Sequence, residues 1–284
     1  AMASSEIEHV YGMVHGLEGL LQRNIICLSD QICEASDLDL LMHAPAMALG
    51  SCRYKLPKEP NETYAQVLEI FREYSIGYFF YCGGNDSMDT ISNLSAYFRS
   101  QNEDIKCVGI PKTVDNDLVE TDHTPGFGSA ARFVAASFSE IMIDSMAYPA
   151  PSITVVEVMG RNAGWLTASS ALARAHGFTG PHLIYLPEVP FDPDDFVARV
   201  KNLLKTENHI LVAVSEGIRW KDGGKYVSEK DSGTVDMFGH VSLGGVADVL
   251  KTLAVEKLGI KGRSVEPSVL QRVAMHLASG TDLK

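Results

Sequence analysis

Apolar segments of two kinds alternate along the chain from residue 76 onward. Short runs rich in branched and aromatic residues predict buried β-strands, namely 76–82, 106–111, 153–160, 182–187 and 209–217. Longer segments with apolar residues at helical spacing predict helices, namely 87–100, 128–148, 162–176, 246–259, 269–279 and one that begins at Asp192, Asp194 and Asp195. Strands that alternate with helices of crossover length indicate βαβ units and parallel sheets. The predicted fold class is therefore α/β.

The chain has 284 residues, which at roughly 150 residues per domain favours two domains. Two prolines in a stretch of small residues at 146–153 follow the predicted long helix and suggest a boundary there. We therefore expect two domains, at 1–148 and 149–284.

Composition and charge narrow the function. Hydrophobic residues make up 45% of the chain and charged residues 21%, as in folded globular proteins. The net charge of −12 disfavours nucleic-acid binding through a basic face. No apolar run reaches the ~18 residues of a membrane span, and the beginning of the chain does not resemble a secretory signal. Five cysteines without C-x-x-C spacing are typical of reduced thiols, so we expect a cytoplasmic protein.

Glycine or charged residues directly follow four of the predicted strands. These segments are GGNDS (83–87), PKTVDND (111–117), MGRNAG (159–164) and SEG (215–217). Because ligands of open parallel sheets bind beyond the carboxyl ends of the strands, these four segments are the candidate site.

The first segment suits a phosphate group. Gly83 and Gly84 let the backbone approach a ligand, and the helix that follows offers free N–H groups. Many strand-to-helix turns use two glycines for structure alone, and neither a P-loop nor a dinucleotide fingerprint is present. Asp86 would repel a polyphosphate unless a metal or a lysine lies between them. It is alternatively the N-cap of the helix, a common role for aspartate.

The segment 111–117 combines a cation, a hydroxyl and carboxylates. Lys112 supplies a compact positive charge for phosphate, and Thr113 a hydroxyl group. Asp115 and Asp117 would share a side of an extended stretch, where one carboxylate takes a proton and the other helps to hold a metal. The alternative is a turn with solvated carboxylates.

Two further residues follow other strands. Arg161 suits a bidentate phosphate contact. Glu216 suits hydrogen bonds to sugar hydroxyls, although a carboxylate in this place is often a buried structural group.

These segments, in this order, resemble the phosphofructokinase family. GGNDS resembles its glycine-rich donor loop, PKTVDNDL its catalytic motif and VVEVMGRNAGW its sugar-phosphate motif. Supporting matches are GSCRY (50–54), TDHTPGFGSA (121–130), SEG (215–217) and LQR (270–272). The resemblance implies two doubly wound, three-layer domains with the active site in the cleft between them. Residues 1–148 would form the pyrophosphate domain and residues 149–284 the fructose 6-phosphate domain. It favours the pyrophosphate-dependent branch, because ATP users have glycine at the positions of Asp86 and Lys112. The Asp86 side chain would block the α-phosphate of a nucleotide, and Lys112 adds charge beside pyrophosphate.

The resemblance also implies roles for single residues. Asp115 resembles the general base that acts on the sugar 1-hydroxyl, while Asp117 lies near Mg²⁺ and the transferred phosphoryl group. Lys112 and Thr113 would contact that phosphoryl group. The implied donor ligands are Gly83, Gly84, Asp86, Ser87, Arg53 and Lys112. The implied sugar-phosphate ligands are Thr113, Asp115, Met159, Gly160, Arg161, Glu216 and Arg272, with Arg263 supplied across a subunit boundary. The implied metal neighbours are Asn85 and Asp117; the family usually has aspartate at position 85, so Asn85 offers a ligand without charge.

The expected activity is reversible phosphoryl transfer from pyrophosphate to the 1-hydroxyl of fructose 6-phosphate, in glycolysis and gluconeogenesis. The family's shared sugar site implies a homo-oligomer, a dimer or a tetramer. An ATP-dependent 6-phosphofructokinase and a non-catalytic sugar-phosphate-binding subunit remain alternatives. The chain begins at what resembles the family's second strand-and-helix unit (10–21) and stops soon after ASGTDLK. We therefore expect the family's first strand and loop, and its C-terminal end, to lie outside this chain.

Overall fold

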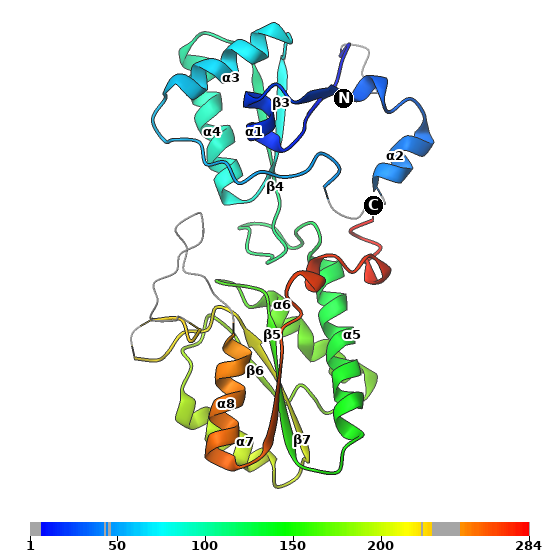
Figure 1. Ribbon diagram of the computed structural model, residues 1–284, viewed down its shortest axis with the longest axis vertical. Helices are drawn as coiled ribbons and strands as arrows, with labels where there is room; N and C mark the ends of the chain where they lie inside the picture. The colour runs from blue at the N-terminus through cyan, green and yellow to red at the C-terminus, as the bar shows by residue number, and fades with distance from the viewer. Residues whose placement is uncertain (1–6, 43, 45–46, 223, 229–244, 284) are drawn as a thin grey trace. The chain divides into compact units, whose positions relative to one another are not determined.

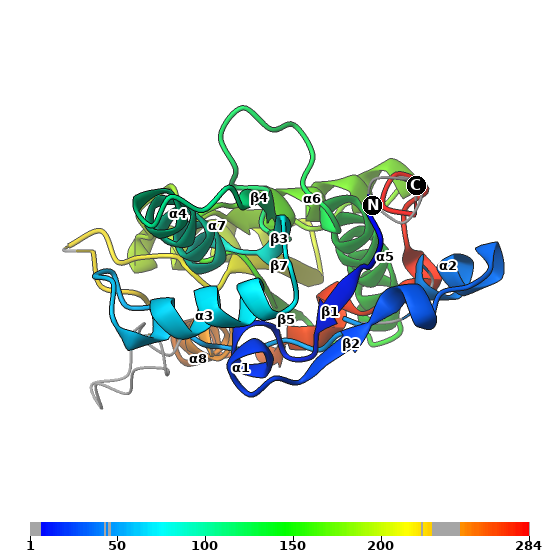
Figure 2. The ribbon, with the colours of Figure 1, turned by 90° about the horizontal axis from the view of Figure 1, so that it is seen from above.

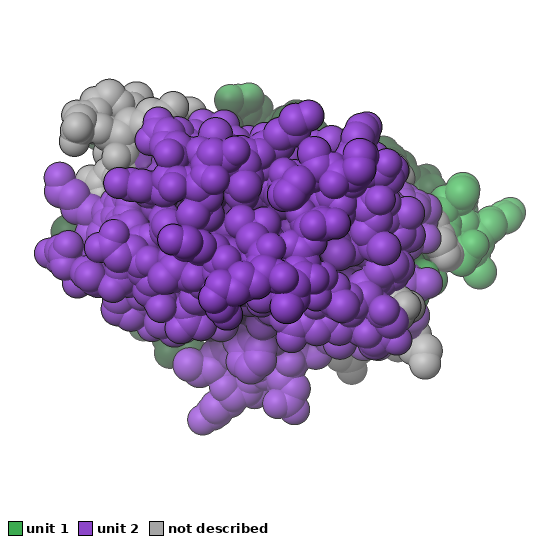
Figure 3. Space-filling model, turned by 90° about the horizontal axis from the view of Figure 1, so that it is seen from below, with its two compact units in different colours: residues 1–112, 283 green, residues 113–282, 284 purple. Residues whose placement is uncertain are grey.

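The computed structural model describes residues 7–42, 44, 47–222, 224–228 and 245–283. They form two compact units, a first unit of residues 1–112 with Leu283 and a second unit of residues 113–282 with Lys284 (Figure 3). The chain divides between Lys112 and Thr113, earlier than the expected boundary at 148/149. The long helix after residue 126 accounts for this difference, because it packs on the sheet of the second unit.

The first unit holds two separate pairs of strands. β1 (Tyr11–Met13) and β2 (Ile25–Cys27) form an antiparallel hairpin around α1 (Gly16–Leu21). β3 (Tyr78–Gly83) and β4 (Lys106–Pro111) pair in parallel through the crossover helix α4 (Asn85–Ser100). The remaining helices are α2 (Ala35–Met42), α3 (Glu62–Glu73) and the 3₁₀ turn Leu28–Asp30 (Figures 1 and 2).

An aromatic cluster forms the core of the first unit. Phe79 of β3 lies against Phe71 of α3, with their ring centroids 5.0 Å apart, and Phe98 of α4 lies 5.5 Å from Phe71. The prediction of a fully buried strand here is wrong, because β3 alternates between buried and exposed side chains. Helices α3 and α4 cover one face, while Tyr78, Phe80, Val108 and Ile110 remain exposed.

The second unit is built on a four-stranded, fully parallel sheet. Its strands lie in the order β6 (Leu183–Tyr185), β7 (His209–Ser215), β5 (Ser152–Val158) and β8 (Lys261–Val265). The helices are α5 (Phe127–Met146), α6 (Trp165–Ser169), α7 (Pro193–Leu203) and α8 (Val246–Leu258). As expected, Asp192 caps α7 by accepting hydrogen bonds from the N–H groups of Asp194 and Asp195.

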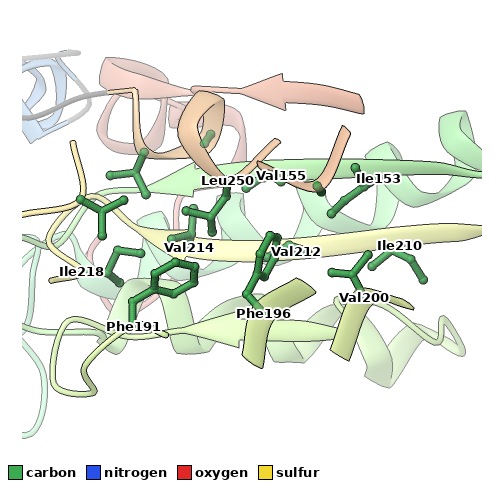
Figure 4. Close-up of a cluster of buried hydrophobic side chains, with 14 residues drawn as sticks. Ile153, Val155, Phe191, Phe196, Val200, Ile210, Val212, Val214, Ile218 and Leu250 are labelled. Atoms are coloured by element: carbon green, nitrogen blue, oxygen red, sulfur yellow. The ribbon is translucent and has the colours of Figure 1, made fainter. Parts of the chain in front are cut away.

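Alternate residues of β5 and β7 point to opposite faces of this sheet. Ile153 and Val155 pack with Phe196 of α7 and Leu250 of α8 (Figure 4). Val156 and Val158 pack on the other face against α5 and α6. Every residue of β7 is buried, as the continuous apolar run predicts. The doubly wound, three-layer arrangement is therefore present in the second unit.

The C-terminal part of the second unit departs from the sequence prediction. The strand β8 is not predicted, since its sequence KGRSV is short and mostly polar at the sheet edge. The helix expected at 269–279 is absent; two 3₁₀ turns, Ser268–Arg272 and Met275–Leu277, replace it. The helix expected at 162–176 divides into α6 and a 3₁₀ segment, Ser170–His176. Among the helices described, not one combines the length and apolar character needed to cross a membrane.

The carboxylate of Asp282 fixes the chain's last described turn to the start of α5. It accepts hydrogen bonds from the N–H groups of Gly126 (2.8 Å) and Ser129 (2.7 Å), and it contacts His123 (3.1 Å). These donors hold the pKa of Asp282 well below its ordinary value, against the opposing effect of burial. The segment TDHTPGFGSA thus provides the docking point for the end of the chain.

Replacing Asp282 by alanine removes these charge-assisted hydrogen bonds. We expect the free energy of unfolding to fall by about 2 kcal/mol at pH 7. Because the native state depresses this pKa, its stabilisation is complete above the unfolded value, near pH 4, and is lost as the pH falls further. Urea unfolding of Asp282→Ala and of an exposed control, Asp222→Ala, at pH 7 and pH 3 measures the effect. Equal losses for the two variants at pH 7 would contradict this role.

Candidate active site

The turn from β3 into α4 presents uncapped backbone N–H groups. Gly84 is the N-cap of α4, and no side chain caps this helix start. Asp86 lies in the first turn of the helix, so the alternative that it is the N-cap is wrong. A Cβ atom on Gly83 would stand 2.1 Å from the Ser87 hydroxyl oxygen, which makes glycine necessary here. This helix start therefore keeps the phosphate-binding character that its sequence predicts.

Two lysines flank this helix start. The backbone N–H of Lys112, at the end of β4, donates to the Gly83 carbonyl over 2.8 Å. The ammonium group of Lys55 lies 3.3 Å from an Asp86 carboxylate oxygen. Arg53 and Lys55 are both exposed, whereas the Leu56 side chain is buried. Lys55 was not among the predicted residues; its place two residues after Arg53 was the only signal for it in the sequence.

In the segment 111–117, the buried Asn116 organises the backbone. Asn116 has a left-handed φ of 58°, so the segment is not extended and the argument that Asp115 and Asp117 share a side is wrong. The Asn116 side chain donates to the Asp122 carbonyl over 3.2 Å and accepts from the Thr124 N–H over 2.9 Å. Asp115 is half-buried and Asp117 is exposed.

Thr113 stabilises the same segment from its other side. The Thr113 hydroxyl oxygen accepts a hydrogen bond from the Asp115 N–H over 3.1 Å. The segment is therefore a constrained turn, held by Thr113 before Asp115 and by Asn116 after it. A turn of this kind gives the Asp115 carboxylate a defined position, as a general base requires.

The loops after β5 and β7 are tied to one another. The Glu216 N–H donates to the Val158 carbonyl over 3.0 Å, and the Gly160 N–H donates to the Glu216 carboxylate over 3.3 Å. The Ser215 hydroxyl donates to the Gly160 carbonyl. A Cβ atom on Gly217 would lie 1.8 Å from the Arg161 carbonyl oxygen, so this close crossing requires glycine.

A third segment joins these two loops. The buried Gln271 side chain accepts a hydrogen bond from the Met159 N–H over 3.0 Å. This contact brings the neighbouring Arg272, which is exposed, to the end of β5. The structure thus gathers the predicted residues Met159, Gly160, Arg161, Glu216 and Arg272. Gln271 was missed, although it stands within the matched segment LQR.

Arg263 lies elsewhere in the second unit. It is the middle residue of β8, opposite Thr154 of β5, and not in a loop beyond the strands. Its guanidinium group lies 2.5 Å from the Asp144 carboxylate of α5. Within one chain, therefore, Arg263 does not belong to the group around Met159 and Glu216.

A metal ion has few candidate ligands here. Within the described ranges, no three His, Cys, Asp or Glu side chains come together as a metal cluster. Asn85 is the first residue of α4, and its side chain lies outside the described part of the structure. Mg²⁺ usually keeps several waters and takes one or two carboxylates together with substrate phosphates. The exposed carboxylate of Asp117 fits that mode of binding.

Comparison with known proteins decides the family. The model of the family described as phosphofructokinase matches residues 1–272. This chain belongs to the phosphofructokinase family.

Several relatives carry the name of one enzyme of this family. The pyrophosphate–fructose 6-phosphate 1-phosphotransferase of Halomonas elongata is 42% identical over 281 residues, which are 98% of this chain and 66% of the relative. The enzyme of the same name from Methylococcus capsulatus is 43% identical over 97% of this chain and 65% of its own length. The chain thus spans slightly less than two thirds of these relatives.

A solved structure and a more distant relative complete the comparison. The pyrophosphate-dependent phosphofructokinase of Marinobacter aquaeolei superposes with a TM-score of 0.81 at 36% identity, over 98% of this chain and 64% of that one. The ATP-dependent 6-phosphofructokinase of Mycobacterium leprae is 30% identical over 93% of this chain and 74% of the relative.

Glu157 is a further titratable group in this chain, two residues before Met159. It is buried, and its carboxylate accepts a hydrogen bond from the Ala247 N–H at the start of α8 over 3.1 Å. Burial raises the pKa of Glu157 to about 7, and the nearby carboxylates of Glu266 and Glu216 add to the rise. The motif VVEVMGRNAGW contains this residue, but nothing in its sequence marked the glutamate as ionisable near neutral pH.

Replacing Glu157 by glutamine removes the ionisation and keeps an acceptor for the Ala247 N–H. Because folding raises this pKa, the carboxyl group stabilises the native state most below its unfolded pKa, and this stabilisation is lost as the pH rises through about 7. We expect Glu157→Gln to unfold at nearly the wild-type temperature at pH 5, and to be more stable by about 3 kcal/mol at pH 8. The control is the exposed Glu266→Gln, for which we expect a much smaller change. A Glu157→Gln difference that does not vary with pH would refute the assignment.

Proposed function

We propose that the protein transfers a phosphoryl group from pyrophosphate to the 1-hydroxyl of fructose 6-phosphate, reversibly, as a cytoplasmic enzyme of glycolysis and gluconeogenesis. One observation carries the choice of donor: Lys112 is hydrogen-bonded by its backbone to the same glycine turn that leads into the helix carrying Asp86. The names of the relatives at 42% and 43% identity support it.

The proposed donor site is the start of α4 with the basic residues around it. Pyrophosphate is compact, and the N–H groups at the start of the helix and the Lys112 side chain are suited to bind it. Asp86, in the first turn, places bulk and negative charge where a nucleotide would extend. The donor ligands of this proposal are Gly83, Gly84, Asp86, Ser87, Arg53 and Lys112.

The proposed sugar-phosphate site is built on the interlocked loops of the second unit. Glu216 and the backbone at Met159 and Gly160 are suited to sugar hydroxyls, since their positions are set by hydrogen bonds to one another. Arg161 and Arg272 are the cations for the 6-phosphate. Arg263 acts in this proposal only across a subunit boundary of a homo-oligomer, a dimer or a tetramer. The proposal also includes an active site in a cleft between the donor domain and the sugar-phosphate domain.

In the proposed reaction, Asp115 removes the proton from the sugar 1-hydroxyl as the oxygen attacks the near phosphorus of pyrophosphate. The bond to the bridging oxygen breaks, and phosphate leaves with that oxygen. Lys112 and Thr113 hold the transferred group in line, so no covalent enzyme intermediate is needed. Mg²⁺, with Asp117 and Asn85 as its nearest protein ligands, would supply neutralising charge on the phosphates when bound.

Two other functions can be distinguished from this one by assaying the protein with each phosphoryl donor. The relative from Mycobacterium leprae is named for ATP, so ATP is the alternative donor. A subunit that binds sugar phosphate without catalysis is the other alternative. The hydrogen bonds of the Asn116 side chain to the backbone of Asp122 and Thr124 fix the turn and favour a working catalytic segment over that subunit.

The test is the formation of fructose 1,6-bisphosphate from fructose 6-phosphate and Mg²⁺, with either pyrophosphate or ATP. We expect turnover with pyrophosphate only. Asp115→Asn keeps the size of the side chain and loses the base, so we expect the rate to fall by about 10²- to 10⁴-fold. Asp122→Asn, an exposed aspartate in the same segment, is the matched control and should keep wild-type activity.

Each other outcome rejects a defined part of the proposal. Turnover with ATP in place of pyrophosphate would overturn the donor argument and leave the base in place. A folded protein without turnover on either donor would favour the non-catalytic subunit. Wild-type activity in Asp115→Asn would remove Asp115 from the mechanism.

A further inference from the structure

The first turn of α4 contains a conflict of charge. If pyrophosphate binds at this helix start, its negative charge approaches the Asp86 carboxylate, which lies in the same turn. Carboxylate and phosphate repel one another at such separations unless a cation lies between them. The proposed donor site therefore needs a positive group in contact with Asp86.

Lys55 is in that position. Its ammonium nitrogen lies 3.3 Å from the Asp86 carboxylate oxygen, and the two side chains are 58% and 43% exposed. A lysine ammonium has three N–H donors, so an ion pair with Asp86 leaves donors for a phosphate oxygen. The exposure of both side chains keeps those donors accessible to a ligand from solvent.

A purely structural role explains this pair poorly. Exposed ion pairs contribute little to the stability of a fold, because solvent and salt screen them. The neighbouring Tyr54 and Leu56 pack inward and already fix the segment, and Tyr54 contacts the Thr63 hydroxyl of α3. The pair thus has a modest structural effect but stands at the charge conflict of the proposed donor site.

We propose that Lys55 is a specificity-determining residue of the donor site: held by Asp86, it bridges that carboxylate to the phosphate oxygens of pyrophosphate. This inference rests on the proposed function. It explains how one carboxylate can obstruct a nucleotide and still tolerate a smaller polyanion. Asp86 then has two effects, since it occupies the nucleotide path and holds the cation that pyrophosphate contacts.

The test compares Lys55→Met, Lys55→Arg and the exposed control Lys58→Met by steady-state kinetics. We expect Lys55→Met to raise the KM for pyrophosphate by about 10- to 100-fold, the size of one charge-assisted hydrogen bond. The KM for fructose 6-phosphate should stay within about twofold, as expected for an effect confined to the donor. Lys55→Arg keeps the charge and should recover most of the loss, and Lys58→Met should behave as wild type.

A double-mutant cycle with Asp86→Ala distinguishes a bridge from a nearby charge. If Asp86 positions Lys55, the effect of Lys55→Met on the pyrophosphate KM shrinks to at most about threefold in the Asp86→Ala background. Equal effects in the two backgrounds would overturn the bridge. An unchanged pyrophosphate KM in Lys55→Met would overturn the inference and leave the proposed function intact.

Direct binding separates this inference from the function on which it rests. Titration calorimetry with pyrophosphate and Mg²⁺ measures the same variants without turnover. Weaker binding by Lys55→Met than by Lys58→Met supports the inference even if the protein proves inactive. A wild-type protein that neither turns over nor binds pyrophosphate would reject the proposed function and this inference together.

Discussion

The interlocked loops after β5 and β7 are the constraint on which the second unit's candidate site depends. The Ser215 hydroxyl and the Glu216 carboxylate each bind the backbone of Gly160, and the crossing at Gly217 leaves no room for a Cβ atom. Because adjacent parallel strands end at the same edge, these loops meet beyond the sheet without a further element. The buried faces of the sheet, filled by α5, α7 and α8, hold the strands in register. The positions of the proposed sugar-phosphate ligands follow from this packing.

The candidate site of the first unit depends on charged groups, whereas that of the second unit depends on close packing. The start of α4 offers N–H groups, Lys112 is fixed to Gly83 through its backbone, and Lys55 contacts Asp86. Positive and negative groups at one helix start select by both attraction and obstruction. In the proposed function, these few residues separate a compact pyrophosphate from a nucleotide. Relatives of this chain carry the names of different phosphoryl donors, pyrophosphate for one and ATP for another.

The parts predicted well from sequence are those determined by local patterns. The strand β4, the helix α8 and the Asp192 cap of α7 depend on residues close in the chain. The errors arose where distant contacts decide the structure. The segment 269–279 has helical spacing, yet Gln271 and Asp282 bind backbone groups of Met159 and Gly126 and draw it into turns. The roles of Lys55, Gln271 and Glu157 depend likewise on partners far along the chain, which no spacing in a single sequence reveals.

The central claim is that Asp86 and the cations beside it determine the phosphoryl donor. The ratio of kcat/KM for pyrophosphate to kcat/KM for ATP, measured for wild type and Asp86→Gly, tests it most directly. Removing this side chain clears the nucleotide path and releases Lys55, so we predict that the ratio falls by about tenfold or more. A ratio that does not change, in a variant that folds and turns over pyrophosphate, would contradict the claim.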